Sequence, residues 1–347
     1  MSNKKILYLY REINPYNIPV FKELVKLGFE IIVIHDTDNK LTPFKTHELE
    51  KVEFIPKNIF SQKQLCQLAL DFQPQLVYVS DRTIRLYNQT AVILRKKLGI
   101  PVIMGCDTQW YGGKQWFNVL TSWFRHKRYF SHILVAGMRQ FEYAKKLGFS
   151  NNEILWPLNS GHTELFSQSP INYSKFRQPR NFLYAGRFAK VKGLDILLEA
   201  WSQLHEKNGA TLTLVGSGPL KNSLKYPEDV IILDFMEQSK LADLAGKSSC
   251  FVLPSIYEPW ALVIHEFAAS GLPLIVTDVC GAAPHFVINN YNGFIVKSNS
   301  VESLKLSMQK IIELPDKDLY EFALRSRELS KSITPEMVAY AINSVLK

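Results

Sequence analysis

Two glutamates eight positions apart, Glu258 and Glu266, are the residues of this 347-residue chain whose spacing most readily supports chemistry. Residues 251–273 read as a strand, a loop that holds Glu258, and a helix that carries Glu266 among apolar side chains. A buried carboxylate is costly unless it accepts hydrogen bonds, and sugar or ribose hydroxyls are suitable donors. In the alternative interpretation, Glu258 only caps a surface helix and Glu266 points to water.

Two other features of the second half could meet a negatively charged group. In the loop 186–193, Gly186 permits a sharp turn, Arg187 offers a planar fork for phosphate oxygens, and Lys192 supplies a compact positive charge. The lysines of this loop could instead be solvated, with Arg187 paired to a neighbouring carboxylate. Free backbone N–H groups at the start of the Glu266 helix could also meet an anion, and these belong to Trp260, Ala261 and Leu262.

A glycine-rich turn, residues 216–219 with the sequence Gly-Ser-Gly-Pro, ends the next apolar run. Such a turn lets a flat ligand approach the backbone closely, and Pro219 suits a first helical position. Gly218 is therefore a candidate ligand-binding residue. The same turn is also common in proteins where no ligand approaches it.

In the first half, polar and aromatic residues follow two apolar runs. The loop 106–116 contains Asp107, which could act on a hydroxyl proton, and Gln109, and its tryptophans suit a carbohydrate ring. Asn17 ends the loop that follows the first apolar run. This loop lacks the glycines of a dinucleotide fingerprint, so no NAD site is expected. Alternatively, Asp107 only shapes its turn.

The elements that would position these loops are short apolar runs, each followed by a helical pattern. This alternation is typical of parallel sheets covered on both faces, in which ligands lie beyond the carboxyl ends of the strands. We therefore predict an α/β fold of two tandem Rossmann-like domains facing a central cleft. The predicted strands are residues 6–10, 30–35, 76–79, 101–105 and 132–136, then 181–185, 211–215, 230–233, 250–253 and 274–277.

The predicted domains are residues 1–165 and 166–332, with residues 158–180 as a linker. Residues 333–347 are expected to form a C-terminal helix that could pack back on the N-terminal domain. Four scattered cysteines form no CxxC pair, so neither a disulfide framework nor a structural zinc site is expected. No run approaches the ~20 apolar residues of a membrane span, and the apolar run before Arg11 is too short for a signal peptide, so we expect a cytoplasmic protein.

The net charge of +9 is concentrated in the first half of the chain. Residues 1–165 hold 22 Lys and Arg against 14 Asp and Glu, whereas residues 166–347 hold 19 against 18. Such a charge suits nucleic acid, an anionic membrane surface or a phosphorylated substrate. The partner of the first half is therefore the one expected to be anionic.

The segments described above, in this order, resemble the family-4 retaining glycosyltransferases, which have the two-domain GT-B fold. Glu258 and Glu266 match the Glu-x7-Glu motif of that family, and residues 216–219 match its nucleotide turn. Gly186-Arg187 with Lys192-Gly193 matches its Arg and Lys pair on the donor diphosphate. Residues 106–115, 137–140 and 144–149 are similar to a subset of the family that acts on bacterial surface polysaccharides.

The resemblance implies a metal-independent hexosyltransferase-type enzyme (EC 2.4) that needs no cofactor beyond its nucleoside diphosphate sugar co-substrate. Arg187 and Lys192 would hold the diphosphate, Glu266 the nucleotide ribose, and Glu258 the hydroxyls of the transferred sugar. The acceptor would be a hydroxyl of a glycan or a lipid-linked molecule, with Asp107 beside it.

Three positions depart from the family pattern. Residues 14–17, Asn-Pro-Tyr-Asn, stand where many members have Gly-Gly, and Trp260-Ala261 stands where many have Phe-Gly, which would reshape the sugar pocket. Asp107 stands where many members have a histidine, and its acceptor-side role is inferred from this position.

Two other function classes stay open. A GT-B-type epimerase or phosphorylase would use the same kind of cleft and phosphate contacts. A non-enzymatic protein could instead bind membranes or nucleic acid through its basic first half. The best segment for this is residues 116–130, whose aromatics among cations suit an anionic bilayer and also suit an ordinary buried helix with a basic end. For a glycosyltransferase we expect no nucleic-acid partner and a possible peripheral contact with the inner face of the cell membrane.

Overall fold

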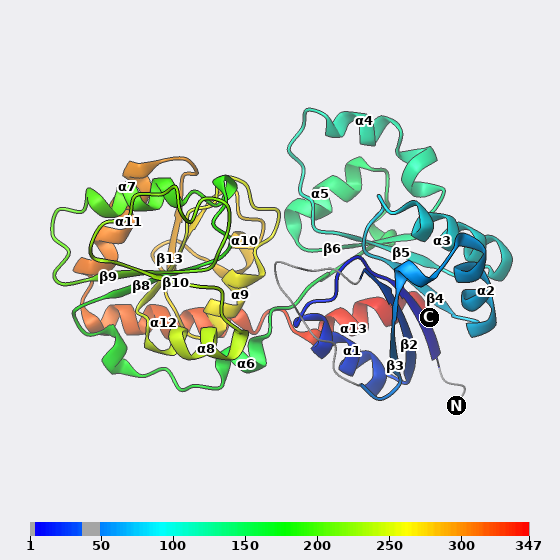
Figure 1. Ribbon diagram of the computed structural model, residues 1–347, viewed down its shortest axis with the longest axis horizontal. Helices are drawn as coiled ribbons and strands as arrows, with labels where there is room; N and C mark the ends of the chain where they lie inside the picture. The colour runs from blue at the N-terminus through cyan, green and yellow to red at the C-terminus, as the bar shows by residue number, and fades with distance from the viewer. Residues whose placement is uncertain (1–3, 37–48, 347) are drawn as a thin grey trace. The chain divides into compact units, whose positions relative to one another are not determined.

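The computed structural model describes residues 4–36 and 49–346. The chain divides into two compact units, each with its own parallel sheet (Figure 1). Unit 1 comprises Met1–Ser160 together with Thr334–Lys347, and unit 2 comprises Gly161–Ile333. The boundary expected at residue 165 falls inside a short helix of unit 2, α6 (Thr163–Ser167).

Unit 1 contains a seven-stranded sheet in the order β3-β2-β1-β4-β5-β6-β7, with every neighbouring pair parallel. Its strands are apolar because both faces of the sheet are covered: Ile6 lies opposite Ile31 and Leu76, and all three are buried. The strands are β1 (Lys4–Leu9), β2 (Phe29–His35), β3 (Val52–Pro56), β4 (Leu76–Val79), β5 (Val102–Cys106), β6 (His132–Val135) and β7 (Ile154–Leu155).

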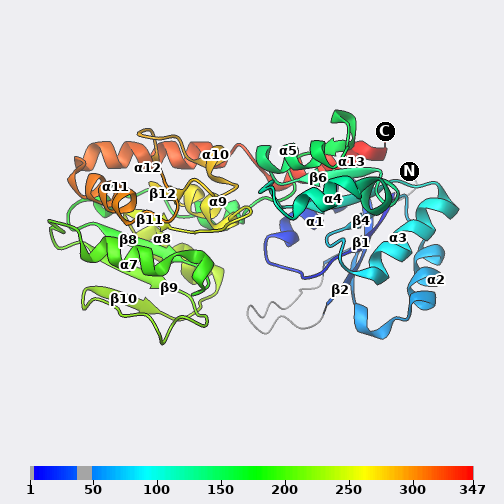
Figure 2. The same ribbon diagram turned by 90° about the horizontal axis from the view of Figure 1, so that it is seen from above.

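Residues 4–36 and 49–346 place six α-helices in this unit. Helices α2 and α3 pack against each other, and so do α1 and α13, which is how the C-terminal residues join unit 1 (Figure 1 and Figure 2). Lys4 Nζ donates to Asn343 Oδ1 at 2.8 Å and ties α13 to the first strand. The helices are α1 (Asn17–Lys26), α2 (Gln62–Phe72), α3 (Arg85–Leu98), α4 (Gln115–Leu120), α5 (Met138–Lys146) and α13 (Pro335–Asn343).

Unit 2 contains a six-stranded parallel sheet in the order β10-β9-β8-β11-β12-β13. Helices α7 and α11 lie on one face, and α6, α8, α9 and α12 lie on the other (Figure 1). The strands are β8 (Asn181–Ala185), β9 (Thr211–Val215), β10 (Val230–Leu233), β11 (Cys250–Leu253), β12 (Leu274–Thr277) and β13 (Gly293–Val296). The other helices are α7 (Leu194–Ser202), α8 (Gln238–Lys247), α9 (Leu262–Ala269), α10 (Ala283–Phe286), α11 (Val301–Glu313) and α12 (Asp316–Ser330).

The predicted class, two tandem Rossmann-like α/β domains, is confirmed by these two sheets. The interpretation of residues 158–180 as a linker is wrong for most of its length. Phe166 and Phe176 are buried, and the guanidinium of Arg180 lies inside unit 2, where it donates to Leu314 O at 2.7 Å and pairs with Asp316 at 2.9 Å. Within residues 4–36 and 49–346, no helix is long and apolar enough to cross a membrane.

Candidate active site

The strand order of unit 2 places two of the predicted loops side by side. The order reverses between β8 and β11, and in open parallel sheets ligands bind beyond the carboxyl ends of the strands at such a reversal. The loop 186–193 follows β8, and the loop 254–261 follows β11. Lys192 and Glu258, which lie on these two loops, therefore come to the same edge of the sheet.

The structure joins Lys192 and Glu258 in an ion pair. Lys192 Nζ donates to Glu258 Oε2, and the two side chains are 19% and 11% exposed. Ser255 Oγ donates to the same carboxylate oxygen at 3.5 Å. The close approach of the loops depends on Gly193, which has φ +65° and whose added Cβ would overlap Pro254 O. The pair thus leaves two largely buried charges compensated by each other.

Backbone hydrogen bonds hold the Glu258 loop in place on both sides. The N–H groups of Ile256 and Tyr257 donate to Val191 O at 2.8 and 3.2 Å. On the other side, Gly281 lies in the loop after β12, and its N–H donates to Glu258 O at 3.2 Å. Because three loops are interlocked in this way, the carboxylate is positioned by the backbone as well as by its own contacts.

The glycine turn after β9 packs against the loop after β8. An added Cβ on Gly216 would overlap Gly186 O, and one on Gly218 would fall 2.5 Å from Phe188 O. Phe188 N also donates to Ser217 O at 2.8 Å. These two glycines therefore make room for the backbone of the loop after β8. This contact alone explains why larger residues would not fit at positions 216 and 218. A ligand contact at Gly186 or Gly218 stays a prediction.

Glu266 is buried on α9 at 7% exposure, within a network that sequence reasoning did not find. Its Oε1 accepts from Gln238 Nε2 at 3.0 Å and from His162 N at 3.4 Å. Gln238 Oε1 lies 3.1 Å from His162 Nδ1. Burial raises the pKa of Glu266 to about 7, although both hydrogen bonds act in the opposite direction. His162 lies in the stretch that reads as a linker, so nothing in the local pattern indicates it.

His265, to which the sequence assigned no role, is fully enclosed. Gly161 N donates to its Nδ1 at 3.0 Å, so Nδ1 is an acceptor and Nε2 carries the proton that reaches Ser330 O at 2.7 Å. Its ring stacks on Phe286, with centroids 4.2 Å apart. Burial lowers the pKa of His265 to about 4, which keeps the ring neutral.

The expected start of the Glu266 helix needs a correction. Helix α9 begins at Leu262, Ala261 precedes it in the left-handed region with φ +79°, and Trp260 lies outside the helix. Trp260 is 4% exposed, and its ring lies 5.4 Å from that of His285. Of the three N–H groups expected at the helix start, only that of Leu262 therefore belongs to a helical residue.

Arg187 is exposed. Tyr184, the penultimate residue of β8, connects it to the ion pair. The Tyr184 hydroxyl donates to Arg187 O at 3.1 Å. Burial raises the pKa of Tyr184, the Glu258 charge raises it further, and the Arg187 charge lowers it. The two charged side chains thus act on the same hydroxyl from neighbouring loops.

In unit 1, Asn17 and Asp107 also come to one edge of their sheet. Asn17 is buried, accepts from Asn14 N at 2.8 Å and donates to Tyr10 Oη at 2.9 Å. Burial raises the pKa of Tyr10 to about 12, and the nearby Asp107 carboxylate contributes to this rise. Asp107 itself reaches the surface, yet the protein atoms around its carboxylate raise its pKa, and Asp81 adds to the effect.

Gln109, the third predicted residue of unit 1, is buried and takes part in polar contacts. Its Oε1 accepts from Arg139 at 3.3 Å, and its Nε2 donates to Tyr111 Oη at 2.6 Å. Beside Asn17 lies a cavity of about 20 Å³, which has room for one water and none for a sugar ring. The cavity walls include Tyr8, Tyr10, Tyr16 and Tyr78.

Comparison with known proteins shows what this chain is similar to. Residues 168–327 match the family model described as "Glycosyl transferases group 1". This range contains the ion pair and Glu266. An uncharacterized glycosyltransferase of Haemophilus influenzae is 24% identical over 338 residues, which cover 93% of this chain and 92% of that protein. The structure of HepE from Anabaena in complex with UDP has a TM-score of 0.73 at 17% identity and covers 99% of this chain and 98% of that one.

Other curated relatives are matched over less of their length. The UDP-Gal:alpha-D-GlcNAc-diphosphoundecaprenol alpha-1,3-galactosyltransferase of Escherichia coli is 27% identical over 143 residues, which cover 38% of this chain and 36% of that enzyme. Several curated relatives are matched over only about a third of their own length. Residues 168–327 are thus similar to group 1 glycosyltransferases, and the two Rossmann-like units together match the fold of these solved structures.

Proposed function

We propose that this protein is a retaining glycosyltransferase that moves a hexose from a nucleoside diphosphate sugar to a hydroxyl of a glycan or lipid-linked acceptor, in the synthesis of a bacterial surface polysaccharide. The observation that carries this proposal is the buried Lys192–Glu258 pair at the strand-order reversal of unit 2, within the region that matches the family. The enzyme would need no metal, because its own cations can serve the diphosphate.

The donor diphosphate would bind to Arg187 and Lys192. Negative charge develops on the leaving diphosphate as the glycosidic bond breaks, so these cations would stabilise the transition state more than the ground state. Lys192 would exchange its partner on donor binding. The diphosphate would take its N–H donors, and the released Glu258 carboxylate would accept hydrogen bonds from hydroxyls of the transferred sugar.

The nucleotide ribose would bind to Glu266. Its carboxylate accepts hydrogen bonds from hydroxyls better when ionised, so donor affinity should increase as the pH rises through the Glu266 pKa of about 7. Binding of UDP by HepE supports a nucleoside diphosphate as the product of transfer. Arg187, Lys192 and Glu266 would contact the diphosphate and the ribose, so other residues would select the base of the nucleotide.

The acceptor would bind to unit 1, where Asn17, Asp107 and Gln109 lie. The raised pKa of Asp107 brings its carboxylate closer to the range in which a base removes a hydroxyl proton efficiently. The excess of 22 cations over 14 anions in residues 1–165 favours an anionic acceptor. The undecaprenol-linked substrate in the name of the E. coli relative supports a lipid-linked one. Retention is then best explained by attack of the acceptor from the face that the diphosphate leaves.

The experiment that tests the proposal is a thermal-shift screen with nucleoside diphosphates and their sugars, because a ligand that binds only the folded state raises the melting temperature. Arg187→Ala should lose most of the shift, and Lys190→Ala, which removes an exposed cation of the same loop, should keep it. Arg187→Ala should also reduce transfer by orders of magnitude. Near-normal transfer by this variant would refute the diphosphate assignment.

Four tests separate the finer parts of the proposal. Incubation of the donor alone should give no isomerised sugar, whereas an epimerase would produce one. The anomeric configuration of the product, read by NMR, should match that of the donor. Transfer should continue in the presence of a chelator. Asp107→Asn should lower turnover, and if it changes neither acceptor affinity nor turnover, the loop of Asp107 is structural.

A further inference from the structure

Unit 1 exposes a cluster of large apolar side chains, here called the α4 surface. Helix α4 and the π-helical turn η2 (Trp123–Lys127) carry it, and α4 buries none of its residues. In Figure 1, α4 lies at the margin of its unit. The apolar residues of the surface and their exposed fractions are Trp116 (54%), Phe117 (61%), Leu120 (78%), Trp123 (72%) and Phe124 (68%). The interpretation of this segment as an ordinary buried helix is therefore wrong.

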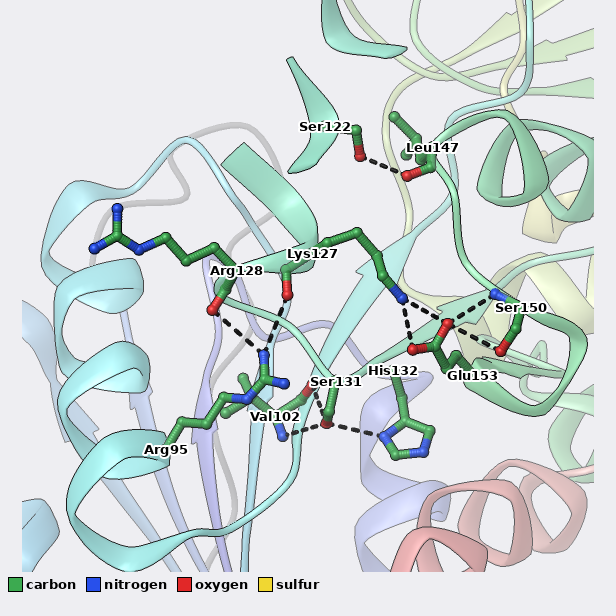
Figure 3. A network of polar contacts seen from close by, with 10 residues as sticks. All are labelled: Arg95, Val102, Ser122, Lys127, Arg128, Ser131, His132, Leu147, Ser150 and Glu153. Carbon is green, nitrogen blue, oxygen red and sulfur yellow. Dashed lines mark hydrogen bonds and ion pairs between the residues drawn. The ribbon is translucent and has the colours of Figure 1, made fainter. Parts of the chain in front are cut away.

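Polar contacts hold the base of this segment against the body of unit 1 (Figure 3). Ser122 Oγ donates to Leu147 O at 2.6 Å, and Lys127 Nζ pairs with Glu153 at 2.5 and 2.6 Å. Arg95 donates to Lys127 O at 3.3 Å. Because Ser122 and Lys127 face the protein, the aromatic residues beside them are left on the outside. The exposure is thus a consequence of how the segment is anchored.

The α4 surface is also basic. Residues 111–128 contain four Lys or Arg and no Asp or Glu. Three of these cations, Lys114, Arg125 and Arg128, are exposed. The guanidinium of Arg125 lies 5.6 Å from the ring centre of Phe117, and Lys146 of α5 lies 5.9 Å from that of Trp116. Cations and aromatic rings therefore share one surface.

We propose that the α4 surface docks on an anionic lipid bilayer. Tryptophan and phenylalanine side chains are favourable at the boundary between headgroups and acyl chains, and lysines and arginines beside them are attracted to anionic headgroups. This proposal concerns how the protein reaches a surface, and it stands or fails independently of the transfer reaction.

Charge distinguishes the bilayer from a second copy of the chain. Two copies that met symmetrically through this surface would bring Arg125 and Arg128 close to the same residues of the other copy, with no carboxylate in residues 111–128 to compensate them. An anionic bilayer compensates every exposed cation. Leu120, the most exposed of the apolar residues, has no aromatic ring on which a nucleic-acid base could stack, whereas it can enter the acyl region.

The first experiment measures co-sedimentation of the full chain with vesicles of phosphatidylcholine alone or with about 30% phosphatidylglycerol, which gives an anionic surface. Binding should require the anionic lipid and weaken at high salt. The variant Trp123→Ser/Phe124→Ser should bind at least about tenfold more weakly. Phe235→Ser, which removes an aromatic residue 51% exposed in unit 2, is the matched control and should bind as the wild type does.

A second pair of variants separates local from overall charge. Arg125→Ser/Arg128→Ser should weaken binding about tenfold or more, since each cation near an anionic membrane contributes about 1 kcal/mol, or roughly fivefold. Lys96→Ser/Lys97→Ser removes two exposed cations from the end of α3 and gives the same net charge. This control should bind nearly as the wild type does, because its cations lie outside the α4 surface.

Insertion has its own readout in brominated lipids, which quench tryptophans that enter the bilayer. Wild-type fluorescence should be quenched, and Trp116→Phe/Trp123→Phe should keep binding while losing most of the quenching. The proposal is overturned if anionic vesicles fail to bind the protein, or if the surface variants and their controls bind equally. It is also overturned if Trp123→Ser/Phe124→Ser instead abolishes dimer formation or binding of single-stranded nucleic acid.

Discussion

Replacing Glu266 by glutamine should make the stability of this protein depend on pH, because it removes one of two adjacent groups whose effects oppose each other. Glu266 and His265 are both buried on α9, at 7% and 1% exposure. Burial raises the pKa of Glu266 from 4.5 to about 7 and lowers that of His265 from 6.5 to about 4. Neighbouring positions on a helix do not face each other, so the two groups titrate through separate surroundings.

The sign for Glu266 follows from where the proton is held. Between pH 4.5 and about 7 the folded state keeps a proton that the unfolded state has lost, so stability falls as the pH rises through this window. One pKa unit corresponds to about 1.4 kcal/mol, so the contribution that is present below pH 4.5 and lost by about pH 7 is about 3 kcal/mol.

His265 acts in the opposite direction over almost the same window. Between about pH 4 and 6.5 the unfolded state binds a proton that the folded state excludes, so stability rises with pH by about 3 kcal/mol. In the wild type these two slopes cancel. Glu266→Gln leaves the His265 slope, and His265→Gln leaves the Glu266 slope while keeping one donor and one acceptor for Ser330 O and Gly161 N.

Urea unfolding of the wild type and both variants, from pH 4 to 8, measures these slopes. The unfolding free energy of Glu266→Gln minus that of the wild type should increase by about 3 kcal/mol from pH 4.5 to 7. The difference for His265→Gln should change by a similar amount with the opposite sign. All other titrating groups cancel in these differences. Two difference curves that stay flat across the window would refute the reasoning.

Two further substitutions test the contacts of the loops after β8 and β9. Lys192→Met should lower the unfolding free energy by about 3 kcal/mol, because it removes the cation that compensates the largely buried charge of Glu258. Adding Glu258→Gln should recover much of this loss, and a single variant as stable as the wild type would show that water already screens the pair. Gly218→Ala should cost more than about 1 kcal/mol in the same urea assay, since its Cβ would fall 2.5 Å from Phe188 O. Gly246→Ala, whose Cβ would have its nearest neighbour at 4.0 Å, should cost nothing, and equal stability of the two alanine variants would contradict this account.

Much of the fold could be predicted from the sequence because buried parallel strands are short, continuous apolar runs. All five strands predicted for the second half have the bounds that the structure shows. The missed β13 begins at Gly293, whose added Cβ would overlap Leu274 O, and it follows a turn rich in asparagine. The missed β3 lies at the edge of its sheet with Glu53 exposed, so its pattern is not continuously apolar.

Less of the candidate site could be predicted, because its contacts join residues far apart in the chain. The sequence indicated that Lys192 and Glu258 serve one site, but their direct pairing depends on the approach of Gly193 to Pro254, which no spacing reveals. One partner of Glu266 is still more distant in the chain than Lys192 is from Glu258. His162 lies 104 positions away, in a stretch with no helical or strand period.

The uneven charge of the chain has a structural counterpart in how its cations are used. In unit 2, Lys192 is compensated by Glu258 at the candidate site and Arg180 by Asp316 elsewhere, so a nearly neutral sequence still carries enclosed charge. Solvent and salt screen such enclosed pairs weakly. The cations of the α4 surface are exposed and have no carboxylate beside them in the sequence, so they contribute to the net charge and to attraction over a distance. The same residue types therefore serve local geometry in one unit and long-range electrostatics in the other.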